Sequence, residues 1–139
     1  MSRVDFYVLQ QTGASVREQF GCRLTGKAYA LQHTVHVRTE SEKHAELVDQ
    51  LLWTFDDSAF VPHDMWRGGE REAPVTIASA DVDPPVDTDV IVNLANSVVT
   101  GGRWRIAEVL CADPDVRAAG RQRFANYRNA GHDMDTHKL

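Results

Sequence analysis

The chain has 139 residues, of which 42% are hydrophobic and 25% are charged, a composition typical of one globular domain with a substantial core. It carries 20 Asp and Glu against 15 Lys and Arg, and this net charge of −5 argues against direct DNA binding, which requires clustered positive charge. The longest apolar run is far shorter than the ~18 residues of a membrane helix, and the amino terminus lacks the apolar region of a signal peptide. We therefore expect a cytoplasmic protein that does not span a membrane.

The first half of the chain alternates between strand and helix patterns. Residues 3–10 are rich in aromatic and β-branched side chains, which predicts a strand. Ser15 and Glu18 form a capping-box pattern, and the apolar residues that follow recur at helical spacing, which predicts a helix. Residues 33–38 predict a second strand, and a further capping-box pattern beginning at Thr39 predicts a second helix.

The second half of the chain continues this alternation. Residues 74–78 and 104–110 predict strands, and residues 87–94 contain a continuous apolar run typical of a strand covered on both faces. Residues 62–73 and 79–85 lack apolar periodicity and are expected to be loops. We therefore predict a single α/β domain with a mainly parallel central sheet flanked by helices. It is Rossmann-like without a nucleotide fingerprint, since neither a G-x-G-x-x-G motif nor a phosphate loop follows the first strand.

The last predicted helix carries the most informative feature. Asp113 and Pro114 are typical of a helix start, and Gly131 is typical of a helix end. Residues 116–129 contain four arginines and no Asp or Glu, although the chain as a whole is acidic. Helical spacing places three of these arginines and one phenylalanine on one narrow stripe, which we call the arginine stripe: Arg117, Arg121, Phe124 and Arg128.

The chemistry of the arginine stripe predicts its ligand. Guanidinium groups bind carboxylates through two parallel hydrogen bonds, and the ring of Phe124 offers an apolar seat beside the charge. We therefore expect a ligand that is both acidic and hydrophobic. The alternative is a solvated helix face with Phe124 packed against the body of the domain.

A second feature is aromatic. Trp53, Phe55 and Phe60 fall at the end of the second predicted helix and after the acidic turn that follows it. Such a cluster either lines the core or forms an exposed protein interface, and the sequence leaves both interpretations open.

The titratable residues form no recognisable catalytic pattern. Cys22 and Cys111 are isolated from each other and from any second cysteine, so they predict core positions rather than a metal or redox site. His132 and His137 lie in a short tail, from about residue 132, that we expect to be mobile and solvated. We therefore predict no enzyme activity, no metal and no cofactor.

Four segments together form a specific set of motifs: Leu52-Trp53, SAFVPH at 58–63, APVTI at 73–77 and RQRFANYRNAG at 121–131. With the opening DFYVL at 5–9 and the overall length, they resemble the chi subunit of bacterial DNA polymerase III holoenzyme over nearly the whole chain. This resemblance implies a small α/β protein without catalytic activity. It also implies an adaptor role in DNA replication.

The resemblance implies two partners. Chi subunits pair with the psi subunit, which links them to the clamp loader, and they bind the acidic, phenylalanine-ending tail of the single-stranded-DNA-binding protein. By resemblance, the tail site comprises residues of the arginine stripe and one apolar wall residue: Arg117, Arg121, Phe124, Arg128 and Leu110. The psi-facing surface comprises Trp53 and Phe60. The alternative function, from a different class, is a small-molecule-binding or nucleotide-binding α/β protein, including an enzyme.

Overall fold

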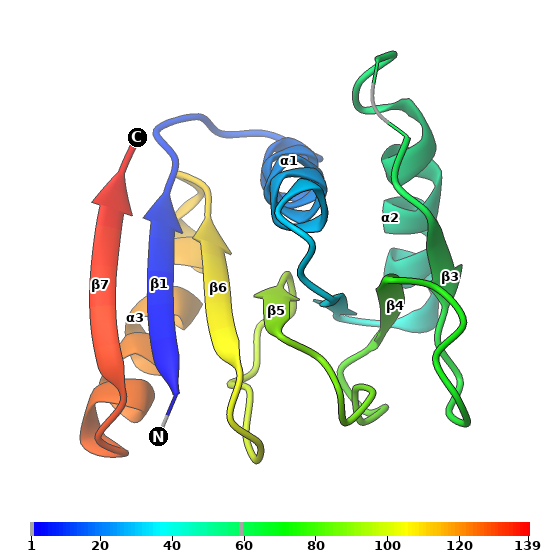
Figure 1. Cartoon of the computed structure of the whole chain (residues 1–139). Coiled ribbons are helices and arrows are strands. Elements are labelled where there is room, and N and C mark those ends of the chain that lie inside the picture. Colours follow the sequence, from blue (N-terminus) through cyan, green and yellow to red (C-terminus); the bar gives the residue numbers. More distant parts are fainter. Residues whose placement is uncertain (1, 59) are drawn as a thin grey trace.

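Seven parallel strands form one central sheet in the part of the chain that the computed structural model describes, residues 2–58 and 60–139. The strand order across the sheet is β3-β4-β2-β5-β6-β1-β7 (Figure 1). In chain order the strands are β1 (Arg3–Val8), β2 (Val35–Thr39), β3 (His63–Met65), β4 (Val75–Ser79), β5 (Val90–Asn93), β6 (Arg105–Leu110) and β7 (Asp133–Lys138). The helices of the described residues are α1 (Val16–Ala30), α2 (Glu42–Thr54) and α3 (Pro114–Asn129). The predicted α/β fold with a parallel sheet is confirmed.

The helices cover opposite faces of the sheet and divide the core into two clusters, which we call the α1/α2 cluster and the α3 cluster after the helices that cover them. α1 and α2 pack together on one face, against β2, β4 and β5. α3 packs on the other face, behind β6, β1 and β7 in Figure 1. The alternation of side chains along β6 serves both faces, because Val109 belongs to the α1/α2 cluster whereas Ile106 and Leu110 belong to the α3 cluster. No described helix combines the length and apolar character needed to cross a membrane.

Both helix starts that were predicted from capping boxes differ in detail. Ser15 has a φ of 67° and makes no side-chain cap hydrogen bond to α1, and Glu18 instead lies 2.8 Å from Nε2 of His44. The cap of α2 is Ser41, whose Oγ accepts from the His44 amide at 3.1 Å. Thr39 is the buried last residue of β2, and its hydroxyl donates to a carbonyl of β4. Tertiary partners therefore engage Glu18 and Thr39, residues of the predicted capping boxes, whereas the cap of α2 is a local hydrogen bond of Ser41.

The carboxyl-terminal residues, which we expected to form a mobile tail from about residue 132, form the edge strand β7. Its six residues pair with β1 in parallel register over their full length. Met134 packs on the α3 cluster, whereas the residues on the opposite face of the strand are polar. The prediction was wrong because backbone hydrogen bonds to β1, rather than an apolar run, hold this strand in the sheet. β3, within the loop expected at 62–73, was missed in the same way, because its pairing with β4 rather than an apolar run holds it in the sheet.

Candidate functional site

The helix that bears the arginine stripe has the predicted bounds. α3 starts with Pro114 after Asp113, and the chain turns after it at Gly131, whose φ is 85°. The Asp113 side chain makes no cap hydrogen bond to the helix and instead accepts one from Sγ of Cys111 at 3.2 Å. The packing of α3 on β6 depends on Gly120, where an added Cβ would lie 2.6 Å from Leu110. Leu110 therefore lies directly beneath the helix.

The four arginines of α3 have different environments. Arg123, which lies outside the stripe, points inward and is fully buried. Arg117 is half-buried, and its guanidinium donates to the backbone carbonyls of Leu9 at 2.9 Å and Cys111 at 3.2 Å. Arg121 and Arg128 are exposed, and the described part of the chain places no carboxylate within ion-pair distance of either. Two guanidinium groups of the stripe are therefore free to bind a ligand, and the third is partly engaged by the fold.

Phe124 is partly buried, and its surroundings agree in part with each interpretation of the arginine stripe, a ligand site or a solvated face with the ring packed on the domain. One side of its ring packs on Phe6, with ring centroids 5.3 Å apart, within the α3 cluster that also contains Leu110. The guanidinium carbon of Arg128 lies 5.9 Å from the centroid of the same ring. The ring thus joins the body of the domain, as the alternative interpretation expects, and remains partly accessible beside a cation.

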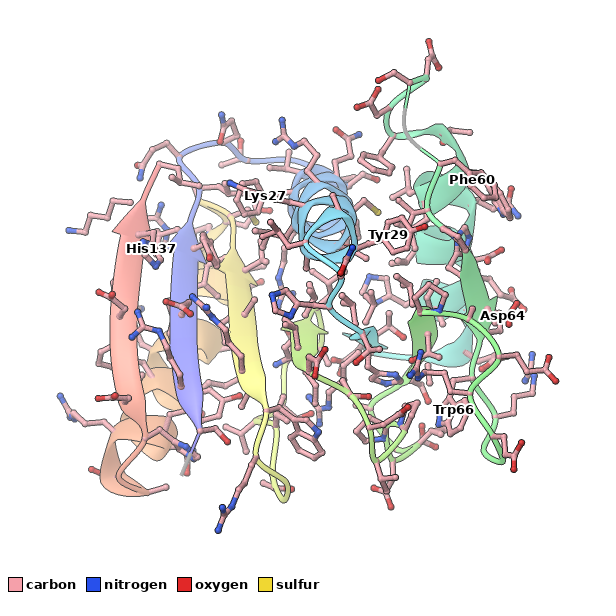
Figure 2. All side chains as sticks on the ribbon, viewed as in Figure 1. Lys27, Tyr29, Phe60, Asp64, Trp66 and His137 are labelled. Atoms are coloured by element: carbon pink, nitrogen blue, oxygen red, sulfur yellow. The ribbon has the colours of Figure 1, made fainter. Side chains whose placement is uncertain are left out.

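The second aromatic feature separates into core and surface. Phe55 packs into the α1/α2 cluster, whereas Trp53 is 51% exposed and Phe60 is 67% exposed. The rings of Trp53 and Phe60, which we call the aromatic pair, lie 5.8 Å apart. The core interpretation is therefore correct for Phe55 and wrong for the aromatic pair. Figure 2 shows Phe60 near the β3 edge of the sheet, at the opposite side of the molecule from His137 on β7.

A buried histidine supports the aromatic pair from below. The ring of His63 lies 4.5 Å from the ring of Trp53, and its side chain is inaccessible to solvent. Its Nδ1 lies 2.7 Å from the Val61 carbonyl, and its Nε2 lies 3.2 Å from a carboxylate oxygen of Asp49. Both ring nitrogens are thus held by groups on α2 and on the loop before β3. This arrangement fixes the platform on which Trp53 lies.

The switch point of the sheet is closed by two arginines. β1 continues into α1 on one face and β6 continues into α3 on the other, and a doubly wound fold binds nucleotides at the carboxyl ends of such neighbouring strands. Here Arg17 donates to the Val109 carbonyl at 2.6 Å, and Arg117 bridges the carbonyls that follow β1 and β6. Burial lowers the pKa of Arg17. No sequence signal marks Arg17, because its two carbonyl partners lie 78 and 92 residues away in the chain.

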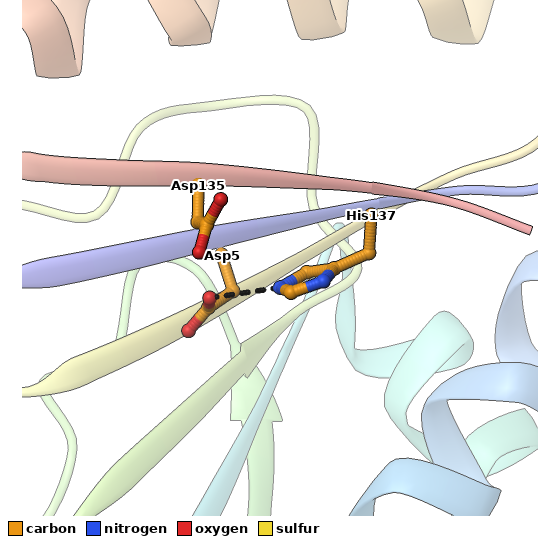
Figure 3. Close-up of side chains that lie close together, drawn as sticks. All are labelled: Asp5, Asp135 and His137. Carbon is orange, nitrogen blue, oxygen red and sulfur yellow. Dashed lines mark hydrogen bonds and ion pairs between the residues drawn. The ribbon is translucent and has the colours of Figure 1, made fainter.

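A group of polar side chains lies on the sheet face beside β7. Asp5, Asp135 and His137 approach one another closely, and His137 Nε2 lies 3.0 Å from Asp5 (Figure 3). Arg3 contacts both carboxylates, at 3.3 Å and 2.9 Å, and Arg105 contacts Asp5 at 3.1 Å. Burial opposes ionisation of Asp5, but hydrogen bonds from His137, Arg3 and Arg105 outweigh it and lower the pKa of Asp5. The group is an ion-pair network, and the expectation that His137 is merely solvated was wrong.

Comparisons with known proteins agree with the residues that carry the resemblance. The family model described as DNA polymerase III chi subunit, HolC, matches residues 1–135. The DNA polymerase III subunit chi of Pseudomonas aeruginosa is 32% identical over 142 residues, which cover 100% of this chain and 98% of the relative. That of Escherichia coli is 27% identical, over 98% of this chain and 97% of the relative.

A solved structure shares the fold. The crystal structure of T4 UvsW matches with a TM-score of 0.67 at 10% identity, over 99% of this chain and 41% of the UvsW chain. A likeness at this identity indicates architecture and carries no functional argument. Family membership therefore rests on the sequence matches over the full chain. The chain belongs to the family of DNA polymerase III chi subunits.

Proposed function

We propose that this chain is a non-catalytic adaptor that joins two protein partners in the DNA replication machinery. Membership of the chi-subunit family gives it an accessory role in DNA polymerase III. One proposed partner is the psi subunit, which would connect the chain to the clamp loader. The other is the acidic, phenylalanine-ending tail of the single-stranded-DNA-binding protein.

The separation of the two candidate surfaces is the observation that carries this proposal. The exposed part of the arginine stripe lies on α3, which covers the face of the sheet formed by β6, β1 and β7. The aromatic pair lies next to β3, at the other end of the sheet, on the side covered by α1 and α2. Two partners placed on these surfaces do not overlap, so one chain can hold both at the same time.

The arginine stripe supplies the two kinds of contact that the proposed tail requires. Arg121 and Arg128 are exposed cations available to carboxylates, and charge-assisted pairs of this kind are strong and directional. Phe124 supplies partly accessible apolar surface for a terminal aromatic ring, and the buried Leu110 lies beneath the helix in the same α3 cluster. Arg117, held by two backbone carbonyls near the start of α3, adds fixed positive charge at the positive end of the helix dipole.

The aromatic pair has the character of an interface anchor. Large aromatic side chains dominate the binding energy of protein interfaces, and Trp53 and Phe60 are both exposed and adjacent. His63 and the start of β3 hold the Trp53 side in place before a partner arrives. Pre-organisation of this kind reduces the ordering entropy that binding must overcome.

A calorimetric titration tests the adaptor proposal directly. The chain is titrated with a synthetic peptide that has the acidic, phenylalanine-ending tail sequence, then with the purified psi subunit, and then with each ligand after saturation with the other. We expect each affinity to stay within twofold when the other ligand is present. Competition between the two ligands, or no binding of either, would contradict the proposal.

A further inference from the structure

A groove of about 450 Å³ runs between α1 and the loop that follows α2, and we call it the α1 groove. Gly26, Phe55 and Val61 form its apolar floor, and Arg23 and Lys27 of α1 line one side. Phe60 lines the groove as well and is also a member of the aromatic pair. The groove is therefore continuous with the proposed psi-facing surface. Figure 2 shows Tyr29 on α1 and Phe60 on the loop across from it.

The floor of the α1 groove depends on a glycine inside a helix. A Cβ at Gly26 would lie 3.2 Å from the ring of Phe55 and 3.7 Å from Val61, so the bare backbone of α1 allows these side chains to approach. A glycine in a helix interior is less stable than an alanine. Its effect here is a depression with an apolar floor beside an exposed aromatic ring.

The charge on the α1 side of the groove is uncompensated. Arg23 and Lys27 are exposed, stand four residues apart on one ridge of α1, and have no carboxylate within ion-pair distance among residues 2–58 and 60–139. Like charges at this spacing destabilise an isolated helix. Lys27 lies in the last turn, where it complements the helix dipole, but Arg23 lies one turn earlier.

The surroundings of the groove point to the same charge preference. The guanidinium of Arg23 lies 5.5 Å from the ring of Phe20, which holds it on the helix surface. Asp56 also lines the groove, and hydrogen bonds from the amide and the hydroxyl of Ser58 lower its pKa, so it stays charged and is outnumbered by Arg23 and Lys27. Two unpaired cations on a chain of net charge −5 thus border an apolar depression.

We propose that the α1 groove binds an acidic segment of the partner that docks on the aromatic pair. A large apolar side chain of that segment enters the groove between Gly26 and Phe60, and neighbouring carboxylates pair with Arg23 and Lys27. The inference rests on the proposed psi-facing surface and extends it, because it assigns a charge and a shape to the bound segment. Electrostatic complementarity of this kind contributes mainly to specificity and to the association rate.

The test is the affinity of the purified psi subunit from the same organism for three variants of the chain, measured at low and high salt. The double variant Arg23→Glu with Lys27→Glu reverses the proposed charge, and we expect its Kd to be at least tenfold higher than that of the parent at low salt. The difference should shrink at high salt, because exposed charge pairs are screened. A control double variant, Arg103→Glu with Lys138→Glu, makes the same change in net charge at exposed positions outside the groove and should bind as the parent does.

A third variant separates the groove from the surface on which it depends. Phe60→Ala removes the aromatic ring and tests the proposed psi-facing surface itself. If Phe60→Ala weakens psi binding and the Arg23/Lys27 reversal leaves it within twofold, the groove inference is wrong and the proposed function stands. If neither variant weakens binding, the psi-facing surface itself is wrong. If the Arg23/Lys27 reversal lowers the affinity for the tail peptide but not the affinity for psi, the groove binds the other partner and the inference is overturned.

Discussion

Arg123 and Glu108 form a fully buried ion pair between α3 and β6, with Nε 3.0 Å from Oε1 and side chains only 2% and 0% exposed. The other carboxylate oxygen accepts hydrogen bonds from the Tyr127 hydroxyl at 2.7 Å and from Asn93 at 2.8 Å. This network fixes the rotation of α3 about its own axis. Since Arg123 points inward, the arginine stripe must point outward, and the buried pair thereby positions the candidate tail site.

Removing one member of this pair should destabilise the domain strongly. Arg123→Met leaves the Glu108 carboxylate buried without its cation, and we expect the free energy of unfolding to fall by about 3 to 5 kcal/mol. Adding Glu108→Gln to the same chain removes the stranded charge, so the double variant should be more stable than Arg123→Met alone. Urea unfolding of the parent and the two variants measures this. A double variant that is less stable than Arg123→Met would show that the pair is not coupled.

Two arginines of the stripe should respond differently to substitution. Arg121 is exposed and engages no described acidic partner, so Arg121→Glu should abolish measurable tail-peptide binding and leave the melting temperature within about 2 °C. Arg117 donates to two backbone carbonyls, so Arg117→Gln should lower both tail binding and stability. Lys43→Glu, an exposed reversal on α2, is the control. Calorimetry measures the affinity of each variant for the tail peptide. If Arg121→Glu binds the peptide as the parent does, Arg121 is not part of the site.

Phe124 should contribute an interaction that salt does not screen. Its accessible ring surface is expected to supply on the order of 1 to 2 kcal/mol to binding of the terminal ring of the peptide. The affinity of the tail peptide should therefore fall with ionic strength but level off at a measurable value. Titrations over a range of salt concentrations give this curve. An affinity that vanishes at moderate salt would show that only the charges bind.

Phe60 and Phe55 should give opposite results when truncated. Phe60 is exposed, so Phe60→Ala should weaken psi binding by about 2 kcal/mol or more while stability and tail binding stay unchanged. Phe55 packs in the α1/α2 cluster, so Phe55→Ala should lower the free energy of unfolding by about 3 kcal/mol. Thermal melting and both titrations on the two variants test this contrast. A large loss of stability in Phe60→Ala would show that Phe60 contributes to the packing of the domain rather than to a partner surface.

The stability of the domain should fall as the pH decreases from about 6.5 to 4. Burial, with a smaller contribution from the charge of Arg38, lowers the pKa of His36 to about 4. An unfolded histidine titrates near 6.5, so the unfolded chain binds more protons in this interval, and the stabilisation from neutral His36 is complete only above it. The contribution lost at low pH is about 3 kcal/mol.

The variant His36→Gln isolates this contribution. It should be less stable than the parent at neutral pH, because it disturbs a buried side chain that contacts Thr76 at 2.7 Å. The difference in unfolding free energy between the parent and the variant should then become smaller as the pH decreases, since the variant has no group to titrate at this position. Urea unfolding at about pH 7 and pH 4.5 measures both differences. If the difference in unfolding free energy is the same at both pH values, His36 does not cause the pH dependence.

The sequence by itself determined the order of the three helices and of five strands, β1, β2, β4, β5 and β6, together with the bounds of α3 and the composition of the arginine stripe. These features depend on local patterns: helical spacing, a Pro at a helix start and a Gly after its end. The motif around Phe60 and the run from Arg121 to Gly131 likewise identified the family without knowledge of the fold. Such signals lie within a few residues of one another, so they can be read directly along the chain.

The tertiary structure alone decided which of these side chains are available to bind. Periodicity states which residues share one face of an element, but elements distant in sequence determine whether that face is covered. Arg117 is engaged by a carbonyl 108 residues away, and β7 exists because β1 offers it an edge. Phe55 lies under α1 whereas Phe60, five residues later, remains exposed. Coverage of a face depends on long-range packing, and for that reason no local pattern distinguishes these two rings.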